Sequence, residues 1–184
     1  RVEGAFSIVA MTDQKLIGVR DPMGMRPLVL GRLADGWVLS SETCALDIIG
    51  AEFIREVAPG EMVVISEKGL ESHFPFRKRA SKFCIFEHVY FSRPDSIVSG
   101  RSVYETRRQI GVELAKESPV EADLVCPVPD SGTPAAIGFS QHSGIPYAMG
   151  IIRNQYMGRT FIEPTDQIRN MGVRLKLNVN RSLI

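Results

Sequence analysis

The chain has 184 residues, of which 44% are hydrophobic, 23% charged and 8% aromatic, which is ordinary for a globular protein and excludes a disordered or collagen-like chain. Its 22 basic and 21 acidic residues leave a net charge of +1, so the overall charge favours neither nucleic acid nor a membrane surface as a partner. No apolar run approaches the roughly 20 residues of a membrane-spanning helix, and no signal-peptide pattern is visible. The cysteines, Cys44, Cys84 and Cys126, are odd in number and widely spaced, which argues against a disulfide framework and predicts a reducing, cytoplasmic compartment.

The two ends of the sequence suggest a piece of a longer protein. The chain begins at Arg1 rather than at Met, and it stops at Ile184 without a polar tail. Any chemistry that needs residues outside this chain is therefore not visible in its sequence.

The first half of the chain is predicted to form antiparallel hairpins. Short apolar runs separated by turn residues predict hairpins that pair 5–11 with 16–19, 27–31 with 36–40, and 61–65 with 70–74. Residues 42–49 are predicted to form a short helix, capped by Ser41 and ended by Gly50. A basic cluster at 77–79 follows, and it fits either a crossing between domains or an ordinary solvated loop.

The second half alternates helix and strand, which is typical of a parallel α/β domain. A capping-box pattern at 102–105 predicts a helix start. The helix that follows is expected to carry one stripe of side chains, namely Val103, Ile110 and Leu114, with Arg107 between them.

A second helix and two strands are predicted further along. Residues 123–128 form a continuous apolar run, as in a sheet covered on both faces. A helix is expected over 135–141, with Thr133 as its cap and Gly144 at its end, followed by a strand over 147–152.

The loop between the first of these strands and that helix is a candidate phosphate site. Ligands of open α/β sheets lie at the carboxyl ends of strands, and a helix N-terminus attracts anions. Gly132 lets the backbone approach an anion, Ser131 and Thr133 add hydroxyl donors, and Asp130 fits a cation or a sugar hydroxyl. A plain strand-to-helix turn remains the alternative.

A basic stretch follows the last predicted strand. Residues 153–181 contain six basic and two acidic side chains, which suits a mobile loop that grips phosphate. A solvated basic face is the alternative. A nucleic-acid loop is disfavoured, because the stretch has a single Tyr and a single Phe for base stacking.

Two further segments have an unusual composition. In 83–96 the aromatics are dense, and strand alternation would place Cys84, Phe86, His88 and Tyr90 on one face, with core packing as the favoured interpretation. Residues 20–28 place a turn and three charges between two strands, which we interpret as a turn with an internal Arg–Asp pair.

Together these segments resemble one family, the glutamine phosphoribosylpyrophosphate amidotransferases, or amidophosphoribosyltransferases. The matching stretches, in the order in which they occur, are RDPMGMRPL, APGEMVVIS, CIFEHVYFSRPDS, PVPDSGTPAAIG, RNQYMGRTFI and GVRLKLNVNRS. The first also occurs in related glutaminase domains, whereas FEHVYFSRPDS followed by GRTFI is highly specific.

The resemblance implies an α+β and α/β protein with two domains. Residues 1–80 would be the C-terminal part of an N-terminal-nucleophile glutaminase domain with an antiparallel sheet. Residues 81–184 would be the N-terminal part of a type I phosphoribosyltransferase domain with a parallel sheet. The implied reaction joins glutamine-derived ammonia to phosphoribosyl pyrophosphate and gives 5-phosphoribosylamine, the first step of de novo purine synthesis.

The resemblance also implies roles for individual residues. The substrate-binding set is Asp130, Ser131, Gly132, Thr133, Arg153, Tyr156, Arg159 and Lys176, with Ser131 near a magnesium ion. The ammonia channel would be lined by Phe86, Tyr90 and Ile162. Cys84 matches a position that ligates a [4Fe–4S] cluster in part of the family, and members without a cluster also carry Cys there, so the cluster stays open.

Two family features are absent, and one other class of protein stays open. Residue 1 is Arg1 where the family has its catalytic cysteine, and the paired-Asp ribose-phosphate loop does not occur, so we expect no catalytic residue and no activity in this chain by itself. The parent is expected to be a cytoplasmic homo-oligomer that purine nucleotides inhibit, with neither nucleic acid nor membrane as a partner. The alternative is a non-catalytic, nucleotide-binding regulator with a phosphoribosyltransferase fold.

Overall fold

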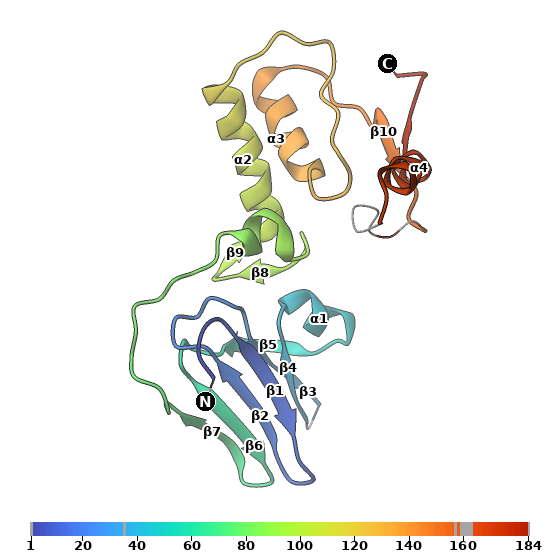
Figure 1. The fold of residues 1–184 in the computed structure, drawn as a ribbon. Coiled ribbons are helices and arrows are strands. Elements are labelled where there is room, and N and C mark those ends of the chain that lie inside the picture. The colour runs from blue at the N-terminus through green and yellow to red at the C-terminus, as the bar shows by residue number, and fades with distance from the viewer. Residues whose placement is uncertain (1, 35, 157, 159–163, 184) are drawn as a thin grey trace. The chain divides into compact units, whose positions relative to one another are not determined.

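The computed structural model describes residues 2–34, 36–156, 158 and 164–183. By their internal contacts the residues divide into two compact units, 1–103 and 104–184, which are described separately (Figure 1). The division lies later in the chain than the predicted domain boundary at 80/81, because residues 84–102 contact the first unit. None of the helices in the described ranges is long and apolar enough to cross a membrane.

The first sheet of unit 1 confirms two of the predicted hairpins. Strands β1 (Ser7–Met11) and β2 (Leu16–Arg20) pair antiparallel, as do β6 (Met62–Ser66) and β7 (Gly69–His73). β2 also pairs with β6, which gives the order β1-β2-β6-β7. Turn residues between short apolar runs were sufficient to locate each of these strands.

The second sheet contains the remaining predicted hairpin and one strand that was not predicted. β3 (Val29–Leu33) and β4 (Gly36–Ser40) form the hairpin, and β5 (Glu52–Glu56) pairs with the other edge of β3. β5 has the sequence EFIRE, whose charges hide the strand pattern, and a register shift at Leu30/Gly31 accompanies its pairing. The order is β4-β3-β5.

The two sheets share a small apolar core. Leu28, Val57 and Val63 are buried together, and Leu39 packs against them from β4. Gly18 on β2 makes room for this contact, because a Cβ there would lie 2.7 Å from a methyl carbon of Leu39.

Helix α1 (Thr43–Ile48) forms as predicted but is not capped as predicted. Its N-cap residue is Glu42, whose side chain makes no capping hydrogen bond, so Ser41 is not the cap. The Glu42 carboxylate instead accepts hydrogen bonds from a segment some 50 residues later in the chain, at Arg93 and Ser96.

Residues 83–96 are not the extended segment that alternation suggested. Residues Glu87–Phe91 form a π-helix, η1, and the short strands β8 (Ile97–Val98) and β9 (Arg101–Ser102) pair after it. The buried members of η1 are Glu87 and His88, whereas Phe86 and Tyr90 are 54% and 63% exposed. The expectation that the aromatics form a core is therefore wrong for the described structure, because helical rotation separates side chains that strand alternation would align.

Unit 2 contains two helices that contact each other through glycines. In α2 (Val103–Glu117) a Cβ on Gly111 would lie 1.8 Å from the Ala135 carbonyl oxygen, and in α3 (Thr133–Ser143) a Cβ on Gly138 would lie 1.9 Å from that of Arg108. The predicted stripe was only partly right, since Ile110 and Leu114 are exposed. The buried positions of α2 repeat every fourth residue, at Val103, Arg107, Gly111 and Ala115.

The described residues of this unit do not form the predicted parallel sheet, apart from one isolated bridge. Residues 123–128 form no strand, and among the described residues the parallel pairing is limited to a bridge between Val125 and Tyr147. Pro127 and Pro129 follow directly, and because proline has no N–H it cannot extend a ladder. α3 begins at Thr133 with Gly132 as its N-cap, so Thr133 is the first helical residue rather than the cap, whereas Gly144 ends the helix as predicted, at φ 76°.

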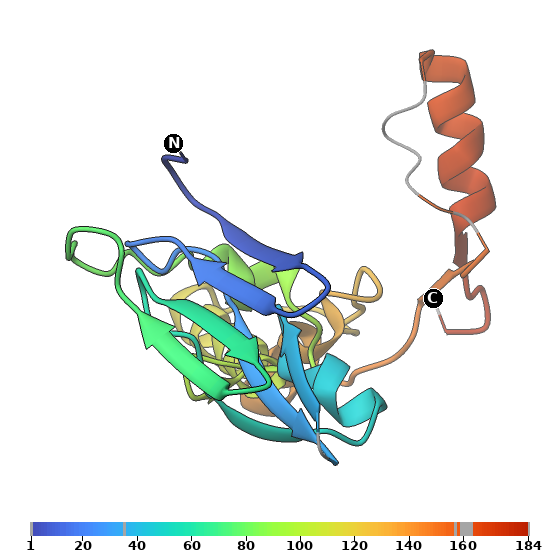
Figure 2. The ribbon, with the colours of Figure 1, turned by 90° about the horizontal axis from the view of Figure 1, so that it is seen from below.

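Parts of the basic stretch form regular structure, whereas the expected phosphate-gripping loop falls partly on residues 157 and 159–163, which lie outside the described residues. β10 (Ile151–Arg153) pairs antiparallel with β11 (Leu177–Val179), and α4 (Asp166–Lys176) precedes β11. The Thr165 side chain caps α4 by accepting from the Ile168 N–H at 3.3 Å. Figure 2 shows α4 as one straight helix with the β10–β11 pair at its end.

Candidate functional site

The turn between β2 and β3 is organised by a buried carboxylate. Asp21 is fully buried, and its two oxygens accept from the N–H groups of Met23 at 2.9 Å, Met25 at 3.0 Å and Arg26 at 3.3 Å. Its backbone N–H donates to Phe6 at 2.9 Å. Asp21 is therefore a partner of the backbone, and the predicted Arg–Asp pair within this turn is wrong.

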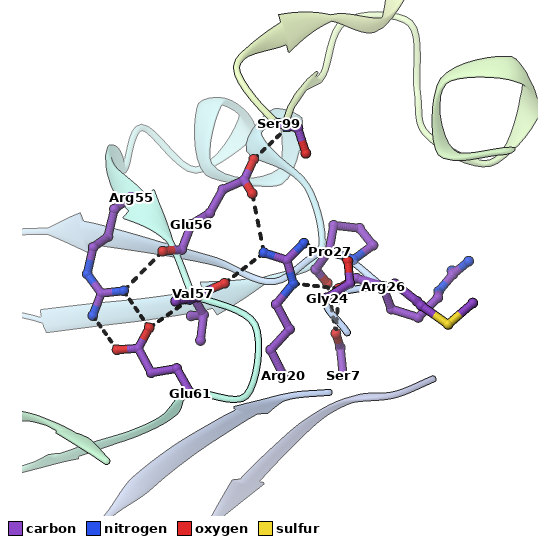
Figure 3. A network of polar contacts seen from close by, with 12 residues as sticks. Ser7, Arg20, Gly24, Arg26, Pro27, Arg55, Glu56, Val57, Glu61 and Ser99 are labelled. Atoms are coloured by element: carbon purple, nitrogen blue, oxygen red, sulfur yellow. Dashed lines mark hydrogen bonds and ion pairs between the residues drawn. The ribbon is translucent and has the colours of Figure 1, made fainter. Parts of the chain in front are cut away.

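The charge of Arg20 is instead balanced outside the turn. Its guanidinium donates to the carbonyls of Val57 at 2.7 Å and Gly24 at 3.2 Å, and it lies 3.3 Å from the Glu56 carboxylate (Figure 3). The other oxygen of Glu56 accepts from the Ser99 N–H at 2.6 Å. Glu56 thereby links the turn to the segment after η1.

A second buried carboxylate links the same turn to η1. Glu87 is 2% exposed, and its Oε1 lies 2.7 Å from a guanidinium nitrogen of Arg26. Its Oε2 accepts from the Ser92 hydroxyl at 3.0 Å. The aromatic residues of the candidate channel, Phe86 and Tyr90, flank this carboxylate on η1 and are exposed.

Sequence reasoning missed the carboxylates that dock residues 93–99 onto unit 1. Glu42 accepts from the Arg93 N–H at 2.8 Å and from the Ser96 hydroxyl at 2.7 Å, and the Thr43 hydroxyl accepts from the Ile97 N–H at 2.9 Å. Glu42 and Glu56 are half-buried and share no local pattern, so their long-range hydrogen bonds are the signal that identifies their role.

In unit 2 the structure joins two of the separately predicted binding segments. The carboxylate of Asp130 forms an ion pair with the guanidinium of Arg153. Asp130 and Ser131 are exposed, directly ahead of α3. Gly132 is needed for the shape of the loop, because a Cβ there would lie 2.8 Å from the Val128 carbonyl oxygen.

Lys176 lies beside the end of β10, the strand that contains Arg153. The Asn154 N–H donates to the Lys176 carbonyl at 2.7 Å, which places the end of α4 next to Arg153. Tyr156 is 99% exposed. The predicted residues Arg159 and Ile162 lie outside the described residues.

The candidate metal ligands differ in how well the structure supports them. No group of three or more Cys, His, Asp or Glu side chains is placed to hold a metal ion within 2–34, 36–156, 158 and 164–183. Cys84 therefore has no [4Fe–4S] ligand set among these residues, and we derive no step through a cluster. Asp130 and Ser131 offer the oxygen donors that Mg²⁺ prefers, in a site where substrate and water would complete the coordination.

Comparison with known proteins gives close relatives over the full length of the chain. It is 56% identical to the amidophosphoribosyltransferase of Rhizobium etli, over 100% of the chain and 38% of that protein. It is 60% identical to that of Synechocystis, over 95% of the chain and 36% of that protein, and 53% identical to that of Mycobacterium tuberculosis, over 100% and 34%. Models of known protein families give no match.

Solved structures give the same result. The glutamine phosphoribosylpyrophosphate amidotransferase of B. subtilis, complexed with ADP and GMP, matches with a TM-score of 0.89 and 46% identity, over 99% of this chain and 40% of that one. A structure described as the allosteric regulatory enzyme of purine biosynthesis matches with a TM-score of 0.87 and 47% identity, over 98% and 39%. This chain thus spans less than half the length of the relatives it matches. By both sequence and structure, it belongs to the amidophosphoribosyltransferases.

Proposed function

We propose that the protein of which this chain is a part makes 5-phosphoribosylamine from phosphoribosyl pyrophosphate and glutamine-derived ammonia. The observation that carries the proposal is the 53–60% identity to amidophosphoribosyltransferases across nearly the whole chain. The ion pair between Asp130 and Arg153 supports it, because it joins two segments chosen independently for phosphate binding.

The two half-reactions would use different parts of the chain. Residues 1–80 would complete a glutaminase domain that hydrolyses glutamine to glutamate and ammonia, and residues 81–184 would begin the phosphoribosyltransferase domain. Ammonia then attacks the anomeric carbon of the sugar, and pyrophosphate leaves. This chain is proposed to hold substrate, with the reacting cysteine and the ribose-phosphate loop supplied from elsewhere in the protein.

The loop ahead of α3 is proposed to bind pyrophosphate. Ser131 and Thr133 would donate hydroxyl hydrogen bonds to phosphate oxygens, and the N-terminal end of an 11-residue helix adds a partial positive charge. Arg153, Lys176, Tyr156 and Arg159 would add further contacts, and the cations among them oppose the charge that develops on the leaving group. A magnesium ion held near Asp130 and Ser131 would neutralise part of the same charge.

The aromatic residues of η1 are proposed to line a path for ammonia. Phe86, Tyr90 and Ile162 are apolar or aromatic, and such a wall keeps ammonia unprotonated and away from water. The exposure of Phe86 and Tyr90 leaves their rings available for this contact.

Further partners follow from the relatives. The B. subtilis structure holds ADP and GMP, and purine nucleotides are proposed as inhibitors here too. The full-length protein is proposed to be a cytoplasmic homo-oligomer. Iron analysis of that protein would test for a [4Fe–4S] cluster with Cys84 as one ligand.

The test is a pair of assays on the full-length enzyme, measuring glutamate and pyrophosphate with glutamine or ammonium as donor. Arg153→Met should lower synthesis from both donors by roughly tenfold to a hundredfold, since a charge-assisted contact contributes about 1.5–3 kcal/mol. Arg159→Ala should do the same. Tyr90→Ala should instead lower synthesis with glutamine while synthesis from ammonium survives.

The control variant is Arg101→Met, which removes an exposed arginine on β9. It should keep both activities. A wild-type enzyme that released no pyrophosphate from phosphoribosyl pyrophosphate with either donor would overturn the proposed function.

A further inference from the structure

Arg26 contacts η1 in two ways at once. Its guanidinium lies 2.7 Å from the Glu87 carboxylate, and the guanidinium carbon lies 5.1 Å from the centre of the Phe91 ring. Arg26 comes from the turn after β2, and Glu87 and Phe91 lie on η1 more than 60 residues later. One side chain thus joins the first and last residues of the π-helix to that turn.

Loss of the ion pair between Arg26 and Glu87 would leave a buried carboxylate without a positive partner. The Glu87 side chain is 3% exposed, and a buried carboxylate needs a positive partner or hydrogen bonds to stay charged. The Ser92 hydroxyl supplies one hydrogen bond, and Arg26 supplies the charge. The Arg26 side chain is 43% exposed, so its own desolvation penalty is small.

The backbone of Arg26 is held in place as well. Its carbonyl accepts from the Arg20 guanidinium at 2.8 Å and from the Ser7 hydroxyl at 3.3 Å (Figure 3). Its N–H donates to Asp21 at 3.3 Å. These hydrogen bonds fix the backbone from which the Arg26 side chain extends. A shift of the turn would therefore move the guanidinium relative to η1.

Phe91 lies in the middle of the exposed aromatic rings. Its centroid is 5.9 Å from that of Phe86 and 6.2 Å from that of Tyr90. The Arg26 guanidinium contacts Phe91, and Phe91 contacts the rings of Phe86 and Tyr90. By restricting Phe91, the guanidinium therefore also restricts the orientation of the other two rings.

We propose that Arg26 is a positioning residue, which holds the rings of Phe86, Tyr90 and Phe91 in register with the glutaminase turn and thereby keeps ammonia transfer coupled to glutamine hydrolysis. The inference rests on the proposed function. It adds a residue that touches neither substrate and acts through Glu87 and Phe91. The planar guanidinium is the essential part, since a lysine ammonium keeps the charge but cannot stack in the same way.

The test uses Arg26→Lys in the full-length enzyme, with Arg32→Lys as a matched control. Arg32 also stacks on an aromatic ring, 4.6 Å from the centre of Trp37, but it belongs to the β3–β4 hairpin. Arg26→Lys should raise the ratio of glutamate to pyrophosphate by roughly twofold to fivefold, the factor that matches the loss of a surface cation–π contact. Synthesis from ammonium should stay at the wild-type rate, and Arg32→Lys should leave the ratio unchanged.

Amide hydrogen exchange gives a readout independent of activity. Arg26→Lys should speed exchange of the amides at 88–92, and Arg32→Lys should not. Phe91→Leu keeps the ion pair while removing the ring, so it should uncouple the products in the same way even if Arg26→Lys folds poorly.

An Arg26→Lys enzyme with wild-type coupling and wild-type exchange in η1 would overturn the inference and leave the proposed function intact. Faster exchange with unchanged coupling would overturn the functional half of the inference. A wild-type enzyme without glutamine-dependent synthesis would overturn the proposed function, and the coupling role of Arg26 with it.

Discussion

At the scale of single residues, unit 1 depends on buried carboxylates whose oxygens are occupied by several hydrogen bonds. Glu61 is the clearest case, because its carboxylate takes two hydrogen bonds from Arg55 at 2.7 and 2.8 Å, one from the Ser72 hydroxyl at 2.6 Å and one from the Ala58 N–H at 2.7 Å. Burial opposes the charge of Glu61, but these hydrogen bonds outweigh it and lower the pKa of the carboxyl. The ionised form is therefore the one that stabilises the fold.

Replacing Glu61 by Gln should lower the free energy of unfolding by about 1–3 kcal/mol at neutral pH, the cost of losing charged hydrogen bonds in a buried site. A carboxyl with a lowered pKa contributes its stability above the ordinary pKa of about 4.3 and loses it as the pH falls through the folded pKa. The difference between wild type and variant should therefore shrink in acid. Urea unfolding between neutral and acidic pH measures it.

The control for this variant is Glu71→Gln on β7, where the carboxylate is 52% exposed beside His73. It should change stability by a few tenths of a kcal/mol at most, as exposed ion pairs do. Equal losses in the two variants would contradict the role given to Glu61.

At the scale of elements, close helix packing sets the identity of two residues in unit 2. Gly111 and Gly138 each lie against a backbone carbonyl of the other helix, so neither position has room for a Cβ. Helix propensity alone would favour alanine by about 1 kcal/mol at each site. For a Gly→Ala substitution, the lack of space thus predicts a lower free energy of unfolding, whereas helix propensity predicts a higher one.

Gly111→Ala and Gly138→Ala should each destabilise the protein by about 1–3 kcal/mol, because overpacking forces the helices apart. Gly158→Ala serves as control, since a Cβ there meets no atom within 4 Å. Thermal unfolding followed by helical circular dichroism distinguishes the variants. Stabilisation by either helical substitution would mean that propensity wins over packing.

The docking of residues 93–97 onto α1 is a second property of elements. Glu42→Ala removes the acceptor for the Arg93 N–H and the Ser96 hydroxyl, and Ser96 is 1% exposed. Amide exchange at Arg93 and at 95–97 should rise by roughly tenfold, as expected for the loss of a charged hydrogen-bond acceptor worth about 1–3 kcal/mol. Glu52→Ala, at an exposed position on β5, should leave this exchange unchanged.

At the scale of the whole molecule, the boundary between the units is set by these long-range contacts. Residues 84–102 belong to unit 1 and contact its earlier residues through Glu42, Glu56 and Arg26, although the change in sequence pattern near residue 80 suggested an earlier boundary. The assignment of 1–80 and 81–184 to two domains of the family stays a prediction.

The parent protein truncated after residue 80 should melt at a temperature about 5–10 °C below the same protein truncated after residue 103, since 1 kcal/mol moves the midpoint of a domain of this size by about 4–8 °C. The two truncated proteins differ only in residues 81–103. Scanning calorimetry gives the midpoints, and equal midpoints would show that residues 84–102 add nothing to unit 1.

Sequence alone determined the elements whose causes are local. The three hairpins, the helices at 43–48, 103–117 and 133–143, and the glycine end of α3 follow from turn residues, apolar spacing and glycine geometry within a few residues. The family followed from short motifs, each recognised within its own window, and the binding roles of Asp130 and Arg153 stay predictions. Each of these inferences used contacts or chemistry that a short window of sequence contains.

Tertiary structure alone decided the partners of the charges and the faces that are buried. Ser96 and Glu42 are 54 residues apart and Ser99 and Glu56 are 43 apart, so no local pattern relates them. The predicted Arg–Asp pair within residues 20–28 is wrong, because backbone N–H groups occupy both carboxylate oxygens of Asp21. The buried face of α2 follows from the close approach of α3, and a helix does not carry the shape of its neighbour in its own sequence.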